Sequence, residues 1–161
     1  MPTLHLQLGG EVVSPDGKRV ALTGSQALQG RGPVVEVSIG IESSAGSGLL
    51  QKGQQLPTPK TGFALIDTGA SNTCIDEKTA EEMGLPVIDV AKMSSASHAG
   101  IDQNVYPIQI TIAGSILQFN VPRAMGGALG AQGLIALIGR DVLQFCTLFY
   151  NGITGQITLS I

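Results

Sequence analysis

The chain has 161 residues, which suits one domain able to bury a hydrophobic core without disulfides or metal. A hydrophobic fraction of 43% and a charged fraction of 13% are typical of a globular protein and exclude a disordered one. The net charge is −3 and no cluster of Lys and Arg occurs, so nucleic acid and anionic membrane surfaces are poor partners. The longest apolar run, residues 134–138, is too short to cross a bilayer.

The two cysteines, Cys74 and Cys146, are fewer than a small secreted scaffold usually carries. We favour two free thiols in a reducing compartment, although one disulfide is compatible with the sequence. Residues 1–11 lack the basic and apolar segments of a signal peptide, which favours a cytoplasmic location. The His and Cys residues are scattered without the spacing of ligand pairs, so we expect no metal and no cofactor.

Many glycines between short apolar runs predict many turns and a mostly β protein. Residues 4–8 alternate apolar and polar, as a half-buried strand does. The pair Asp16-Gly17 predicts a hairpin that joins residues 11–13 to residues 18–22.

Residues 24–33 are rich in Gly, Gln and Ser, which indicates a connector. A strand is expected over residues 34–41, and a long loop without periodicity over residues 42–60. We therefore divide the chain into an N-terminal extension, residues 1–33, expected to be a β-hairpin packed on the domain, and a main domain, residues 34–161.

A short apolar run over residues 62–66 ends at Asp67. Residues 76–83 are predicted to be helical, because Asp76 is a good N-cap and Gly84 a good stop signal.

Two strands, residues 87–93 and 104–112, enclose a cluster of small residues and so predict a hairpin with a small tip. A further strand is expected over residues 116–121, followed by a Gly-rich loop over residues 122–133. In the C-terminal part, a buried strand is predicted over residues 134–138 and one or two helical turns over residues 140–145. Residues 147–150 and 156–161 are predicted to form a hairpin.

The sequence Ile66-Asp67-Thr68-Gly69-Ala70 places a carboxylate where a buried strand runs into a Gly turn. Burying a lone Asp costs free energy unless it is hydrogen-bonded, so this Asp is either a turn residue or a functional acid. Gly69 allows a tight turn that leaves amide N–H groups facing the carboxylate, and the Thr68 hydroxyl can brace it.

A second run, Leu137-Ile138-Gly139-Arg140, follows about seventy residues later. Together the two runs resemble the retropepsin family, which comprises retroviral aspartic proteases and their cellular relatives. The resemblance covers roughly residues 34–161. It implies an all-β closed barrel of the acid-protease type with short helices, and an endopeptidase that cuts extended polypeptide.

The resemblance assigns the catalytic carboxylate to Asp67 and its support to Thr68, Gly69 and Ala70. The later run becomes the loop that supports the active site, and the small-residue tip becomes a flap over the substrate. That flap consists of Ser94, Ser95, Ala96, Ser97, His98, Ala99 and Gly100. Because the chain has only one Asp-Thr-Gly, the second carboxylate must come from a twin subunit, which implies a two-fold homodimer.

The sequence departs from the family pattern at Ser71, where retroviral enzymes commonly have an acidic residue that pairs with the Arg of the later run. Arg140 therefore needs another partner, and Asp76 or Asp141 are candidates. Asp141 could alternatively supply the second carboxylate within one chain, although the resemblance places it on a supporting helix.

Three other classes of protein compete. Ser71 with His98 as base would suggest a serine hydrolase, but Thr73 stands where the nucleophile elbow needs Gly. The glycines of residues 126–130 lack the spacing and the Lys of a phosphate loop. The remaining alternative is a non-catalytic module of the same fold that dimerises or binds peptides by strand addition.

Overall fold

The structure is a computed structural model that describes residues 2–95 and 98–161, with side chains outside residues 94–99. Short strands dominate it, as the glycine-rich sequence predicts. The strands are β1 (Thr3–Gln7), β2 (Gly10–Val13), β3 (Arg19–Leu22), β4 (Val34–Ile41), β5 (Lys60–Ile66), β6 (Cys74–Asp76), β7 (Asp89–Ser95), β8 (His98–Ile112), β9 (Gln118–Gly127), β10 (Ala136–Ile138), β11 (Thr147–Asn151) and β12 (Gln156–Ser160). The helices are α1 (Gly24–Arg31), α2 (Ser43–Gln51), α3 (Glu77–Met83), the 3-10 turn η1 (Gly130–Gln132) and α4 (Arg140–Leu143).

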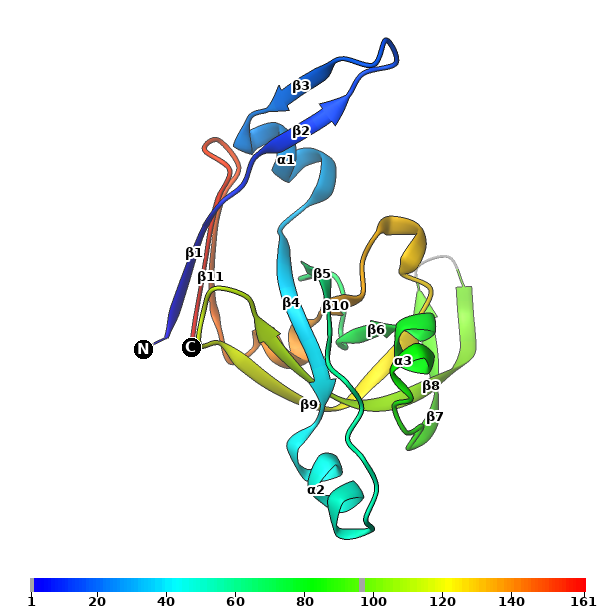
Figure 1. The fold of residues 1–161 in the computed structure, drawn as a ribbon. Helices are drawn as coiled ribbons and strands as arrows, with labels where there is room; N and C mark the ends of the chain where they lie inside the picture. The colour runs from blue at the N-terminus through cyan, green and yellow to red at the C-terminus, as the bar shows by residue number, and fades with distance from the viewer. Residues whose placement is uncertain (1, 96–97) are drawn as a thin grey trace.

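Six strands close into a barrel in the order β4-β5-β10-β6-β9-β8, because β8 returns to pair with β4 (Figure 1). Strand β7 pairs with the outer part of β8 and extends the sheet beyond the barrel. Closure removes the free edges that an open sheet would expose. The predicted all-β closed barrel with few short helices is therefore confirmed.

Alternating β-branched residues fill the barrel. On β4 the side chains of Val37 and Ile39 are fully buried, and they pair across the ladder with Ile112 and Ile110 of β8. Since successive side chains of a strand point to opposite faces, this alternation places one apolar row from each strand inside.

The two ends of the chain meet in a second sheet of three antiparallel strands in the order β1-β12-β11. Leu4 of β1 lies opposite Leu159 of β12, and both side chains are buried in the core of the molecule. The predicted strand near the N-terminus and the C-terminal hairpin are both present.

The hairpin predicted around Asp16-Gly17 is present as β2 and β3, and it projects from the rest of the molecule (Figure 1). The connector predicted for residues 24–33 is wrong, because most of it forms helix α1. Thr23 begins this helix with a capping box, and its hydroxyl accepts a hydrogen bond from the N–H of Gln26. Burial of Leu28 then stabilises a segment whose composition alone favours a loop.

The loop predicted for residues 42–60 is wrong in its first half, which forms helix α2. The Glu42 carboxylate accepts a hydrogen bond from the N–H of Ala45 at 2.9 Å and so caps the helix. The helix was not predicted because hydrophobic residues do not recur with a clear helical period in this glycine- and serine-rich stretch.

The Gly-rich loop predicted for residues 122–133 is wrong at its start, because β9 continues to Gly127. Gly126 and Gly127 pair with Ile75 and Asp76 of β6 in a parallel ladder. A Cβ at 126 would collide with the carboxylate of Glu77, so a larger residue there would require the Glu77 side chain to move. Strand β8 is likewise longer than predicted and starts at His98.

Candidate active site

Asp67 directly follows strand β5 of the barrel and is held in place by backbone hydrogen bonds. Its N–H donates to the carbonyl of Ile138 on the parallel strand β10 at 2.9 Å. The chain then turns, so that the N–H of Gly69 donates to Asp67 Oδ1 at 2.8 Å and the N–H of Ala70 donates to the Asp67 carbonyl. The carboxylate is half-buried, which leaves it open to water or a ligand.

Gly139 supports this loop from beneath at very close range. A Cβ at 139 would lie 2.5 Å from the carbonyl carbon of Asn72 and 2.8 Å from the nitrogen of Thr73. Only Gly allows the two backbones to approach so closely. The physical role of the Gly in the second run is thus to let β10 and its turn press against the Asp67 loop.

A buried network joins Thr73 to this turn. The Thr73 hydroxyl donates to Asp141 Oδ1 at 2.8 Å and accepts a bond from the N–H of Gly139 at 3.0 Å. The N–H of Thr73 also faces both oxygens of Asp141, at 2.9 and 3.0 Å. Asp141 is therefore occupied with fixing the loop, and nothing in these contacts aims it at Asp67. This role of Thr73 was not predicted, because its partners Gly139 and Asp141 lie 66 and 68 residues away in the chain.

Arg140 braces the same loop from the outside. Its guanidinium donates to the carbonyl of Thr68 and to the Ser71 hydroxyl, both at 2.7 Å. Both partners suggested from the sequence, Asp76 and Asp141, are wrong. Ser71 itself replaces the acidic partner, since a hydroxyl can accept the same hydrogen bond without a charge.

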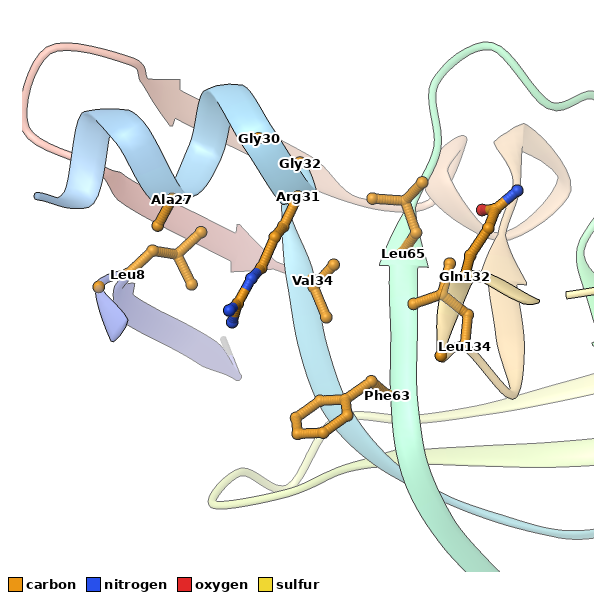
Figure 2. Close-up of a pocket in the computed structure, with 12 residues that line it drawn as sticks. Leu8, Ala27, Gly30, Arg31, Gly32, Val34, Phe63, Leu65, Gln132 and Leu134 are labelled. Atoms are coloured by element: carbon orange, nitrogen blue, oxygen red, sulfur yellow. The ribbon is translucent and has the colours of Figure 1, made fainter. Parts of the chain in front are cut away.

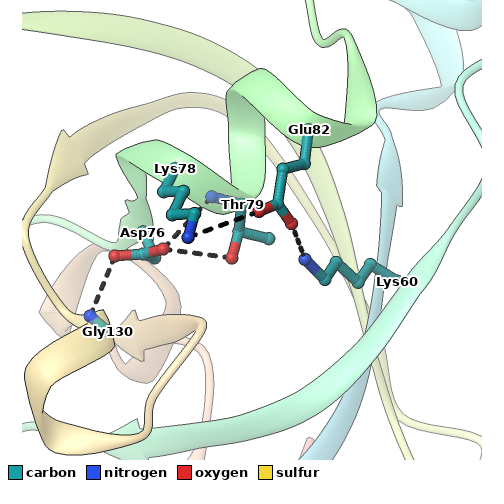
Figure 3. Close-up of polar contacts among 6 residues, drawn as sticks. All are labelled: Lys60, Asp76, Lys78, Thr79, Glu82 and Gly130. Carbon is teal, nitrogen blue, oxygen red and sulfur yellow. Dashed lines mark hydrogen bonds and ion pairs between the residues drawn. The ribbon is translucent and has the colours of Figure 1, made fainter.

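Asp76 fastens a different loop, as Figure 3 shows. Burial alone would raise its pKa, yet bonds donated by the N–H groups of Leu129, Thr79 and Gly130 lower the pKa overall. The predicted N-cap role is confirmed, and Gly84 ends the helix in the left-handed conformation as expected. Nearby, Glu82 forms ion pairs with Lys60 and Lys78.

A cavity of about 500 Å³ opens beside Asp67 and Thr68. Its far wall is formed by Leu148 and Tyr150 of β11. The carboxylate thus faces a space large enough for several side chains, and not a closed core.

The predicted flap corresponds to the end of the β7–β8 pair, where Met93 lies opposite Ile101 and Ser95 opposite His98. Ala96 and Ser97 lie outside the described residues, as do the side chains of Ser94, Ser95, His98 and Ala99. Gly100 has a positive φ of 54°, which favours glycine.

Leu137 and Ile138 are brought beside Leu65 and Ile66 by the parallel pairing of β10 with β5. The structure therefore unites the two sequence runs into one hydrogen-bonded unit around Asp67.

Both cysteines have free thiols in the structure. Burial, and then the negative charges of Asp141 and Asp67, raise the pKa of Cys74 to about 11. Within residues 2–95 and 98–161, no group of three or more His, Cys, Asp or Glu is placed to hold a metal ion. No helix in that same part of the chain is long and apolar enough to span a membrane.

A family model described as aspartyl protease matches residues 60–133, which include Asp67, Thr68 and Gly69. This match covers a little under half of the chain and supports the predicted resemblance to retropepsin-like aspartic proteases. Among curated proteins, no sequence matches this chain.

Two solved structures are similar to this chain. One is a retropepsin-like aspartic protease from Rickettsia conorii, with a TM-score of 0.42 and 12% identity over 98% of this chain and 92% of that one. The other is the retroviral protease-like domain of Ddi1 from Leishmania major, with a TM-score of 0.39 and 16% identity over 74% of this chain and 82% of that one.

Proposed function

We propose that this protein is an aspartic endopeptidase that hydrolyses peptide bonds of extended polypeptides. The observation that carries the proposal is the state of Asp67. Asp67 is half-buried at the end of strand β5, and its carboxylate accepts a bond from one N–H of its own turn and borders a cavity. Its loop is fixed on two sides by Gly139 and Arg140, which is the preorganisation that a catalytic group requires.

The chemistry needs a second carboxylate. In aspartic proteases in general, two carboxyl groups share one proton around a water molecule, because like charges so close cannot both ionise readily. The ionised group takes a proton from the attacking water, and the protonated group polarises the scissile carbonyl. Asp141 is committed to Thr73, so we assign the second carboxylate to Asp67 of a twin subunit.

An exposed aromatic side chain next to the site supports this homodimer. Tyr150 of β11 is 49% exposed and lines the cavity beside Asp67. Exposed aromatic side chains are frequent in surfaces that another protein covers. A two-fold axis beside the exposed Thr68 would bring the Asp67 turns of both subunits together.

In the same proposal, residues 94–100 close over the substrate as a flap, and residues 1–33 remain an N-terminal extension of the protease domain. The extension is tied to the rest of the chain by the pairing of β1 with β12. A polypeptide substrate would lie between this flap and the Asp67 end of the barrel, and main-chain hydrogen bonds would hold it there.

The test combines digestion of a peptide library with analytical sedimentation. Wild type should sediment as a dimer and cleave peptides, whereas Asp67→Asn should dimerise and cleave none. Asp16→Asn, in the turn of the distant β2–β3 hairpin, is the matched control and should cleave normally. Binding of library peptides by wild type without cleavage between pH 3 and 8 would instead favour the non-catalytic peptide-binding module.

A further inference from the structure

A groove runs between the N-terminal segment and the barrel, as Figure 2 shows. Its volume is about 620 Å³. Apolar side chains form most of its walls: Leu8 and Ala27 on one side, Val34, Phe63, Leu65 and Leu134 on the other. Among the residues that the structure describes, no acidic side chain lines it. Residues of helix α1 and of strands β4 and β5 contribute to its lining.

Arg31 supplies the one full charge among the lining residues. It is the last residue of α1, and its side chain points into the groove between Leu8 and Val34 (Figure 2). Within the described part of the chain, no carboxylate pairs with it. The guanidiniums of Arg19 and Arg123, by contrast, each have a carboxylate partner.

The groove lies next to the cavity beside Asp67, since Arg31, Gly32 and Leu65 line both spaces. Along β5, Phe63, Leu65 and Asp67 alternate with inward residues and so share one face. Each residue of an extended chain spans about 3.3 Å. A polypeptide that crosses Asp67 would therefore reach the groove about two to four residues from its scissile bond.

We propose that Arg31 is a specificity-determining residue, which pairs with an acidic side chain of the polypeptide substrate two to four residues from the cut bond. The inference rests on the proposed protease function and names its substrate class. Charge complementarity carries it: a lone guanidinium in an apolar, acid-free groove fits a carboxylate through a forked pair of hydrogen bonds. Leu8, Phe63 and Leu134 would take an apolar neighbour of that acidic residue.

A simpler role for Arg31 is to cover Leu8 and Val34 with its aliphatic stem. The substitution Arg31→Met separates the two roles, because it keeps the apolar stem and removes the charge. Arg31→Lys keeps the charge but not the planar fork. Arg19→Met, on the exposed hairpin, is the matched control for loss of one positive charge.

The experiment measures kcat/KM for peptides blocked at both ends that carry Glu or Gln at successive positions around the cleavage site. Wild type should prefer Glu over Gln about fivefold at one position, as a partly exposed ion pair allows. Arg31→Met should bring the ratio of kcat/KM for the Glu and Gln peptides to about one; Arg31→Lys should keep part of the preference, and Arg19→Met all of it. Rising ionic strength should weaken the preference.

Cleavage without any preference for Glu, or a preference that survives in Arg31→Met, would overturn the inference and leave the protease function intact. If no peptide is cleaved, the same pairs are compared by fluorescence anisotropy with Asp67→Asn. Tighter binding of Glu peptides that depends on Arg31 would then support the inference while the protease function fails; equal binding would refute both.

Discussion

The substitution Thr73→Val tests how the candidate active-site loop is held. Val has nearly the shape of Thr, and the side chain is fully buried, so packing changes little. What is lost is the hydroxyl, which donates to Asp141 Oδ1 and accepts from the N–H of Gly139. A hydrogen bond to a charged group contributes about 1.5–3 kcal/mol, and a buried N–H left unsatisfied costs about 1–3 kcal/mol.

Since the methyl group that replaces the hydroxyl offsets part of this loss, we expect Thr73→Val to lower the free energy of unfolding by about 3 kcal/mol. The measurement is urea unfolding followed by circular dichroism, at one fixed protein concentration because the stability of an oligomer depends on it. Thr73→Ser keeps the hydroxyl and should lose only about 1 kcal/mol, the value of one buried methyl group. If Thr73→Val proved as stable as Thr73→Ser, the network would not support the loop as described.

Three further predictions concern single positions. Gly139→Ala should destabilise the fold by at least about 3 kcal/mol, because the added Cβ would collide with the backbone of Asn72 and Thr73. The control Gly48→Ala, at a position in α2 with open space around it, should stabilise the fold by about 0.5–1 kcal/mol in the same urea assay. Because the pKa of Asp76 is lower in the folded state, its carboxylate stabilises the fold at pH values above the unfolded-state pKa, near 3.8. This contribution should be lost as the pH falls through the folded-state pKa. Unfolding curves of Asp76→Asn between pH 2 and 6 should therefore lack this part of the acid dependence. With a pKa of about 11, buried Cys74 should react with iodoacetamide at pH 8 much more slowly than half-buried Cys146, and mass spectrometry should find equal rates in urea.

The sequence predicted what is encoded locally. The two runs around Asp67 and Gly139 were recognised because each consists of an apolar segment followed by a Gly turn. The helix after Asp76 was predicted because its N-cap and its stop signal are local residues. The mostly β composition follows from glycines between short apolar runs, whereas the closed barrel was expected from the resemblance to the retropepsin family. The predicted roles of the flap and of the second subunit remain predictions.

The parts that could not be predicted depend on distant contacts. Thr73 and Asp141 are 68 residues apart in the sequence, and no local pattern predicts that their side chains contact each other. Glu77 was also missed. Its Oε1 accepts bonds from Asn104 and Tyr106 at 2.7 Å, while Oε2 is buried without a partner among the described residues. Helix α1 was missed for a different reason: its stability comes from a cap at Thr23 and from burial, not from composition.

The most direct test of the shared catalytic pair is a subunit-mixing assay. Wild type and Asp67→Asn are unfolded together in equal amounts, refolded, and assayed for peptide cleavage at constant total protein. If each active site needs one Asp67 from each subunit, only dimers of two wild-type chains are active, and activity should fall to about one quarter of that of wild type. Activity of about one half, proportional to the wild-type fraction, would show that one chain suffices and would contradict the two-fold active site.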